Sequence, residues 1–168
     1  MYLIDGNNVI GRRAKGYESW FHDKPGARRQ FLLDLAALAK AKKLRLTVVF
    51  DGAPDASFPD GASYRGVKVF YARHGSDADT RIVQLVEAER NKKNLTVVTS
   101  DRKLTDRVRV CGVRVMRAGE FQQLMDDAAA AAPSAGMPSA NTVKKEEMNE
   151  WLRYFGADED DENNGDDE

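Results

Sequence analysis

Residues 1–10 read MYLIDGNNVI, in which a short apolar strand runs directly into Asp5. The same arrangement returns three times along the chain. The strands are LTVVF at 46–50, which runs into Asp51, VKVFY at 67–71, whose following loop holds Asp77 and Asp79, and LTVVTS at 95–100, which runs into Asp101. Ligands of an open parallel α/β sheet bind outside the carboxyl ends of its strands. We therefore expect these aspartates to converge at one edge of a sheet.

Strands of β-branched and apolar residues alternate with segments of helical period through about residue 127, which predicts βαβ units and a parallel sheet. The clearest helix covers 26–43, with five apolar residues on one face. Further helices are expected from about residue 77, over 102–110, and after a fifth strand at 113–116. The 53–66 connection is rich in proline and glycine, so it is expected to be a mobile loop at the rim of the site.

The chain is expected to divide into a domain over 1–127, a flexible linker over 128–141 and a C-terminal extension. Within 142–156, apolar residues spaced for one helical face predict an amphipathic helix that docks on its own domain or on a partner. The acidic tail, 157–168, is expected to be disordered.

The length of 168 residues fits one domain with an appendage. No apolar run approaches the roughly 18 residues that span a membrane, and the N-terminus does not resemble a signal peptide. One cysteine, Cys111, fits a reducing cytoplasm and a role as a small apolar side chain. We therefore expect a cytoplasmic protein.

Charge is distributed unevenly along the chain. Residues 158–168 hold 8 acids and no base, and residues 128–157 hold 3 of each, so residues 1–127 carry 23 bases and 16 acids, a net charge of about +7. A basic body points to a polyanionic partner, although a solvated surface with an acidic tail would give the same composition.

Four aspartates at four strand ends repel one another unless a cation lies among them. Mg²⁺ and Mn²⁺ prefer such oxygen ligands, and a pair of these ions can activate water and stabilise the leaving oxygen of a phosphodiester. The candidate ligands are Asp5, Asp51, Asp79 and Asp101. For any one aspartate a helix N-cap is an equally good interpretation, and Asp77 and Asp101 both precede predicted helices.

Other chemistries have less support. Neither a Walker pattern nor Gly-x-Gly-x-x-Gly follows the first strand, and the start lacks the second aspartate of phosphatases with an aspartyl nucleophile. His22 and His74 stand apart from any cysteine or histidine cluster, which disfavours a zinc site.

Four segments together resemble the motifs of NYN-domain proteins, in the family's order. They are MYLIDGNNVI at 1–10, VFDG at 49–52, SDADTRI at 76–82 and VTSDR at 98–102. Within that group the sequence is most similar to the YacP-like nucleases, relatives of PIN domains. The resemblance covers about residues 1–127. It implies a Rossmann-like, PIN-like three-layer α/β sandwich with a mainly parallel sheet, and metal-dependent ribonuclease activity with Mg²⁺ or Mn²⁺.

Matched motif by motif, the resemblance assigns Asp5, Asp51, Asp79 and Asp101 to the metal site. Asn8 matches a family asparagine that would orient a water or the first carboxylate, whereas Asn7 stands where many members carry an aromatic residue. Supporting positions are expected at Asp77, Thr99 and Ser100.

Basic residues beside these motifs would hold flanking phosphates of an RNA, preferably single-stranded. The candidates are Arg12, Arg13, Lys24, Arg28, Arg29, Arg102 and Lys103, each of which is otherwise an ordinary surface charge. Aromatic side chains in predicted loops could stack on bases or anchor the loops: Tyr17, Trp20, Phe21 and Tyr64.

The sequence favours a metal-dependent endoribonuclease that acts in mRNA decay or RNA processing. Two alternatives stay open: a catalytically inactive module that binds RNA or the ribosome, and a toxin-type nuclease. A pure RNA binder gains nothing from a concentrated group of acids, which disfavours the first alternative.

Overall fold

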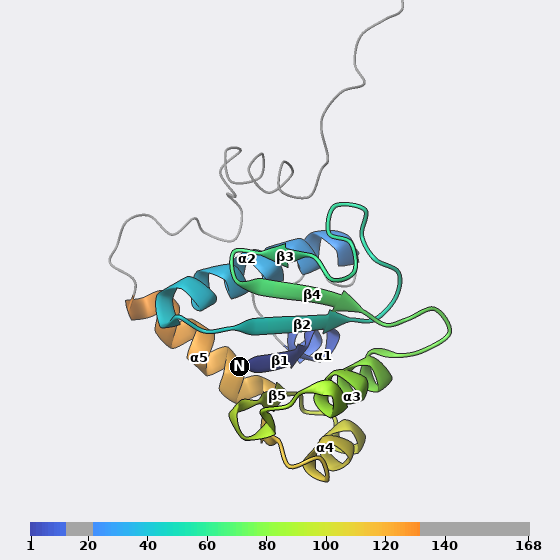
Figure 1. Ribbon diagram of the computed structural model, residues 1–168. Coiled ribbons are helices and arrows are strands. Elements are labelled where there is room, and N and C mark those ends of the chain that lie inside the picture. The colour runs from blue at the N-terminus through green and yellow to red at the C-terminus, as the bar shows by residue number, and fades with distance from the viewer. Residues whose placement is uncertain (13–21, 132–168) are drawn as a thin grey trace, which may run out of the picture.

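A six-stranded sheet forms the centre of the molecule in a computed structural model that describes residues 1–12 and 22–131 (Figure 1). Its strands are β1 (Tyr2–Asp5), β2 (Leu46–Phe50), β3 (Ser63–Tyr64), β4 (Val67–Tyr71), β5 (Thr96–Val98) and β6 (Arg114–Met116). The order across the sheet is β3-β4-β2-β1-β5-β6, and every neighbouring pair is parallel except β3 with β4. The five predicted strands are confirmed, and the short antiparallel β3 is an addition.

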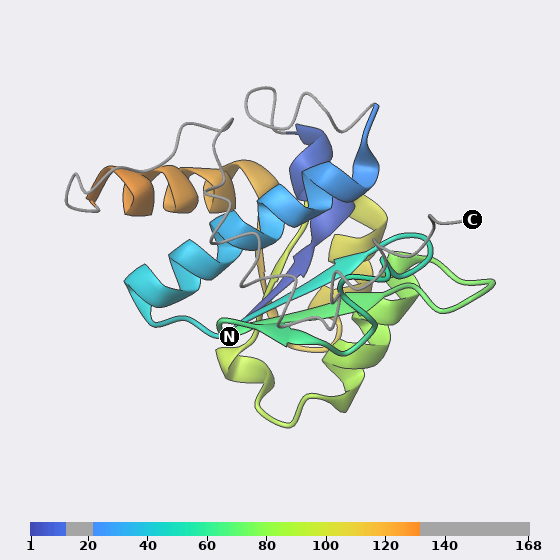
Figure 2. The same cartoon turned by 90° about the horizontal axis from the view of Figure 1, so that it is seen from above.

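Helices cover both faces of this sheet (Figures 1 and 2). They are α1 (Gly6–Arg12), α2 (Lys24–Lys42), α3 (Ala78–Ala88), α4 (Arg102–Arg109) and α5 (Ala118–Ala131), with a 3₁₀ turn, η2 (Lys92–Asn94), before β5. Helices α1, α2 and α5 pack together on one face, and α3 packs with α4 on the other. The predicted three-layer α/β sandwich is confirmed.

Alternation of side chains along the strands builds a separate core on each face. On the face of α1, α2 and α5 the strands contribute Ile4, Val48, Phe50 and Val98. On the face of α3 and α4 they contribute Leu3, Val49 and Val97. Because the inner strands are covered on both faces, they read as continuous apolar runs in the sequence.

Aspartates cap the helices that start near the strand ends. Asp23 accepts a hydrogen bond from Gly26 N at 2.9 Å at the start of α2. Asp77 accepts one from Thr80 N at 2.8 Å, and Asp101 one from Leu104 N at 2.8 Å. The N-cap interpretation of Asp77 and Asp101 is therefore confirmed for one oxygen of each side chain.

The predicted C-terminal regions lie almost wholly outside the described residues. Helix α5 extends through Ala131, so residues 128–131 of the predicted linker are helical, as an alanine run favours. The rest of the linker, the predicted 142–156 helix and the 157–168 tail are not described. Among the residues that are described, no helix has the length and apolarity required to cross a bilayer.

The strand order changes direction at β1. The chain moves outward from β1 through β2 to β4, then returns across β1 to β5 and continues outward to β6. Sheets of this kind leave a crevice at the carboxyl ends of the strands on either side of the reversal. Here those strands are β1 and β5, which run into Asp5 and toward Asp101.

Close packing of α1 on β2 gives a first testable prediction. A Cβ atom on Gly6 would lie 2.5 Å from Phe50 Cε1 and 2.9 Å from Val48 Cγ2. We expect Gly6→Ala to lower the free energy of unfolding by about 1–3 kcal/mol, measured by urea denaturation. Gly11→Ala is the matched control on the same helix, since a Cβ there meets nothing within 4 Å. Equal effects of the two substitutions would contradict this packing argument.

Candidate metal centre

Parallel register brings Asp5 and Thr99 together at the carboxyl ends of β1 and β5. Leu3 is paired with Val97, so two residues further on Asp5 and Thr99 are aligned on the same face of the sheet. The Thr99 hydroxyl donates to Asp5 Oδ2 at 3.1 Å, and Asp101 N donates to Thr99 Oγ1 at 3.1 Å. Thr99, which is 1 % exposed, thus connects the first and the last of the predicted ligand positions.

Asn8 and Ser100 extend this network to two helices. Asn8 N donates to Asp5 Oδ1 at 3.4 Å, while Ser100 N donates to Asn8 Oδ1 at 2.9 Å. The Ser100 hydroxyl oxygen accepts a hydrogen bond from Ala118 N at 3.0 Å, at the start of α5. The network therefore joins α1, the β5–α4 loop and α5 around the buried Asp5 carboxylate.

Asp51 follows β2 and lies on the same face of the sheet as Asp5, because Asp5 is paired with Val49. Ala78 N, in the first turn of α3, donates to Asp51 Oδ1 at 2.7 Å. This bond brings the start of α3 to the end of β2. Asp79, in that same turn, is thereby placed at the edge where Asp5 and Asp51 lie.

Burial and the charges of neighbouring aspartates act in the same direction on Asp5 and Asp79. Burial raises the pKa of Asp5 to about 7, with smaller increases from Asp79 and Asp51, against the hydrogen bonds from Thr99 and Asn8. Burial also raises the pKa of Asp79, and the charges of Asp101, Asp77 and Asp51 raise it further. Together with the strand register and the hydrogen bonds of Thr99 and Ala78, these influences place the aspartates of four motifs at one edge of the sheet.

Their donor chemistry fits a hydrated divalent cation. Within residues 1–12 and 22–131, no three Asp, Glu, His or Cys side chains are spaced to bind one ion directly. Mg²⁺ commonly takes only one or two carboxylates directly and keeps several of its waters, through which further carboxylates can act. A group whose donors are all oxygen suits such an ion better than zinc.

Asp77 differs from its neighbours. Its side chain is exposed, and bonds from Thr80 lower its pKa. With one oxygen engaged in capping α3, Asp77 supports the helix that presents Asp79. Asp77, expected to support the site, therefore does so as the N-cap of α3.

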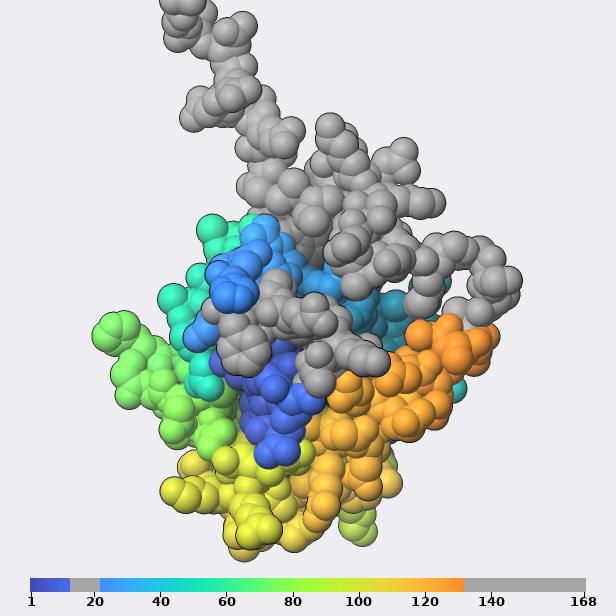
Figure 3. Space-filling view, turned by 180° about the vertical axis from the view of Figure 1, so that it is seen from behind, coloured from blue at the N-terminus to red at the C-terminus, as the bar shows by residue number. Residues whose placement is uncertain are grey.

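Exposed basic residues lie near the site on two helices. Arg12 ends α1, and Arg102 and Lys103 form the first turn of α4 directly after Asp101. Figure 3 shows α1 at the surface beside α4. Lys24 is exposed and Arg29 partly buried at the start of α2, and Arg13 lies outside the described residues.

Two sequence predictions need correction. Arg28 is 9 % exposed and donates to the Asp51 main-chain oxygen, so its guanidinium packs within the protein and is not placed in an open phosphate groove. Tyr64 is 1 % exposed, because β3 packs its ring into the core, and it cannot stack on a base. Tyr17, Trp20 and Phe21 lie outside the described residues.

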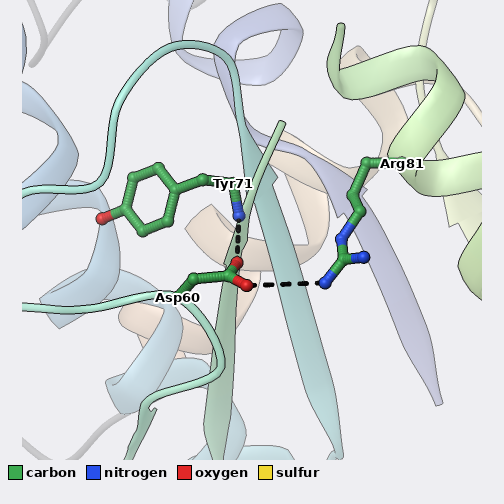
Figure 4. A network of polar contacts seen from close by, with 3 residues as sticks. All are labelled: Asp60, Tyr71 and Arg81. Atoms are coloured by element: carbon green, nitrogen blue, oxygen red, sulfur yellow. Dashed lines mark hydrogen bonds and ion pairs between the residues drawn. The ribbon is translucent and has the colours of Figure 1, made fainter. Parts of the chain in front are cut away.

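Arg107 and Arg81 were not predicted. Arg107 is exposed on α4, and its charge contributes to the lowered pKa of Asp77 and opposes the raised pKa of Asp79. Its position one turn after Lys103 was the available signal. Arg81 on α3 lies 3.5 Å from Asp60, which also accepts a hydrogen bond from Tyr71 N at 2.8 Å (Figure 4). That contact ties the 51–66 connection to the helix that carries Asp79; no sequence pattern indicates it.

The sequence matches the model of a known family. Residues 2–155 match the family model of the YacP-like NYN domain. The chain belongs to this family. Its YacP-like NYN domain is of the PIN-like nuclease type.

Solved structures agree on the fold. A point mutant of Rae1 (YacP) from Bacillus subtilis superposes on the YacP-like chain with a TM-score of 0.64 at 22% identity, covering 77% of this chain and 76% of that one. A second Rae1 (YacP) crystal structure from Bacillus subtilis gives 0.61 at 22% identity, covering 77% and 75%. No curated protein matches the sequence.

Burial of Asp5 predicts a pH-dependent stability in the absence of metal. Between the unfolded pKa near 3.8 and the folded pKa of about 7, the folded protein binds more protons, so stability falls as pH rises. The Asp5→Asn substitution removes the titrating group and with it this loss of stability at higher pH. Relative to the parent, the variant should gain about 2–3 kcal/mol in unfolding free energy from pH 5 to pH 8, since one pKa unit is worth about 1.4 kcal/mol.

The measurement is urea denaturation with chelator at both pH values. Asp106→Asn on α4 is the control, because Asp106 is exposed. An Asp5→Asn advantage that is the same at pH 5 and pH 8 would show that Asp5 does not titrate near neutrality.

Proposed function

We propose that this YacP-like protein is a metal-dependent endoribonuclease that hydrolyses phosphodiester bonds of single-stranded RNA, in mRNA decay or RNA processing. The observation that carries the proposal is the buried Asp5 carboxylate, which shares the carboxyl edge of a parallel sheet with Asp51, Asp79 and Asp101. A binding module would have no use for a carboxylate buried against like charges, whereas a cation site needs one.

Asp5, Asp51, Asp79 and Asp101 would hold Mg²⁺ or Mn²⁺. When bound, such an ion supplies a water activated for attack on phosphorus and stabilises the developing negative charge. The donors are all oxygen, which is the chemistry these ions select.

The chain's own groups prepare this site before any ligand arrives. Thr99 fixes Asp5 through its hydroxyl and fixes the Asp101 main chain through its oxygen. Asn8 has its side-chain oxygen engaged by Ser100 N, so its amide N–H groups are the atoms that remain to donate. They would orient a water molecule or a phosphate oxygen beside Asp5.

The net positive charge of the domain favours RNA, a polyanion, as the substrate. Residues 1–127 carry 23 bases and 16 acids, although the centre of the site is acidic. Arg12, Arg102 and Lys103 are exposed on helices that start at the strand ends. They would hold phosphates that flank the scissile bond, and this binding should weaken with salt. Binding to the ribosome would use the same charge.

The proposal predicts cleavage that requires both the metal and the aspartates. Labelled single-stranded RNA should be cut with Mn²⁺ or Mg²⁺ and remain intact with chelator. Asp5→Asn and Asp101→Asn should each lower the rate at least about 100-fold by removing charge that holds the ion. Asparagine retains the capability of capping α4, so Asp101→Asn should keep the fold.

Asp106→Asn serves as the charge-matched control on α4 and should cleave at the parent rate. Tight RNA binding with no cleavage under any metal condition would refute the nuclease and support an RNA-binding module. Cleavage that persists at full rate in chelator would refute the metal requirement.

A further inference from the structure

The Arg28 side chain occupies an unusual place for a charged group. It projects from the second turn of α2, and only 9 % of it is exposed. Its guanidinium carbon lies 5.3 Å from the centre of the Phe50 ring and 5.9 Å from that of the Tyr71 ring. A planar guanidinium packs against aromatic faces in a way that a lysine ammonium does not.

From this position Arg28 Nη2 donates to the main-chain oxygen of Asp51. The carboxylate of the same residue accepts the bond from Ala78 N at 2.7 Å. Helix α2 and helix α3 belong to opposite layers of the sandwich. Asp51 is thus held by its main chain from one layer and by its side chain from the other.

The main chain at Asp51 depends on contacts of this kind to keep its position. Directly after Asp51 comes Gly52 with φ +85°, and no α-helix follows in the connection to β4. Asp5 and Asp79, by contrast, belong to a strand and to a helix, and Asp101 caps the helix that follows it. Among these four aspartates, Asp51 alone begins a helix-free connection, so its position depends most on outside contacts.

We propose that Arg28 is a positioning residue that fixes the end of β2 so that Asp51 meets the other carboxylates around a divalent cation. The inference rests on the proposed function. It replaces direct phosphate binding by Arg28, because a guanidinium packed between a main-chain oxygen and two aromatic rings is not available to an RNA backbone.

The test is Mn²⁺ affinity, measured by calorimetry without RNA. Arg28→Met keeps the length of the side chain and removes its donors, and the Kd for Mn²⁺ should rise about 10- to 100-fold, the usual effect of losing a group that orients a ligand. Arg28→Lys keeps the charge and one possible donor to Asp51, so its Kd should fall between those of the parent and Arg28→Met. With chelator present, RNA affinity should be unchanged in both variants.

Two controls separate positioning from general damage. Arg45→Met removes an exposed arginine that precedes β2, at the opposite end of the strand, and should keep the parent Kd. Phe121→Leu thins the core at α5, and should lower stability while keeping the Kd for Mn²⁺. Circular dichroism melting compares stability across the set, and Arg28→Lys carries the test if Arg28→Met does not fold.

The possible failures are distinguishable. A parent protein that binds no Mn²⁺ refutes the proposed function itself. If the parent binds Mn²⁺ and the folded Arg28 variants bind it equally well, the positioning role is wrong. If the Arg28 variants lose RNA affinity in chelator but keep their Mn²⁺ affinity, Arg28 binds RNA phosphates instead of positioning Asp51. A Kd that rises as much in Phe121→Leu as in Arg28→Met would mean that the effect is general destabilisation.

Discussion

The carboxylate of Asp5 is buried at the carboxyl end of the central strand, and the rest of the site is organised around it. The register that places Leu3 and Val97 in one core also places Asp5 beside Thr99 on the same face. Ionised Asp5 receives hydrogen bonds from the Thr99 hydroxyl and from Asn8 N, while the charges of Asp51 and Asp79 disfavour its ionised form. Without a counter-ion this arrangement destabilises the folded state near neutral pH. A bound cation would offset that contribution by favouring the ionised form of Asp5.

Main-chain N–H groups of α3 and α4 hold the carboxylates around the site in place. Ala78 N holds the Asp51 carboxylate, Leu104 N holds that of Asp101, and Thr80 N holds that of Asp77. Each donor is a free N–H in the first turn of a helix, where the helix dipole also favours a negative charge. Parallel topology supplies these helix starts at the same edge as the strand ends. The fold therefore provides both the aspartates and the main-chain N–H groups that stabilise their negative charge.

Sequence patterns predicted the parts of this molecule that depend on neighbours along the chain. Apolar runs located five strands, and the aspartates that follow four of them, Asp5, Asp51, Asp79 and Asp101, were expected at one edge. Arg28 was assigned to a phosphate groove because its sequence position shows only a helix start; its burial depends on Phe50 and Tyr71, which come from two later strands. The prediction that Tyr64 could stack on a base was wrong for a similar reason. A two-residue strand such as β3 is too short to show a recognisable sequence pattern.

The most direct test of this account is the titration of the Asp5 carboxyl group itself. Carbon-detected NMR of protein labelled at aspartate carboxyls follows each pKa, and Asp5→Asn assigns the signal. Without metal, one signal should titrate near pH 7. Saturating Mg²⁺ should move that midpoint down by at least about one pH unit, because a bound cation favours the ionised form. An Asp5 midpoint near 4 without metal, or one that Mg²⁺ leaves unchanged, would contradict the claim that this buried carboxylate is built to receive a cation.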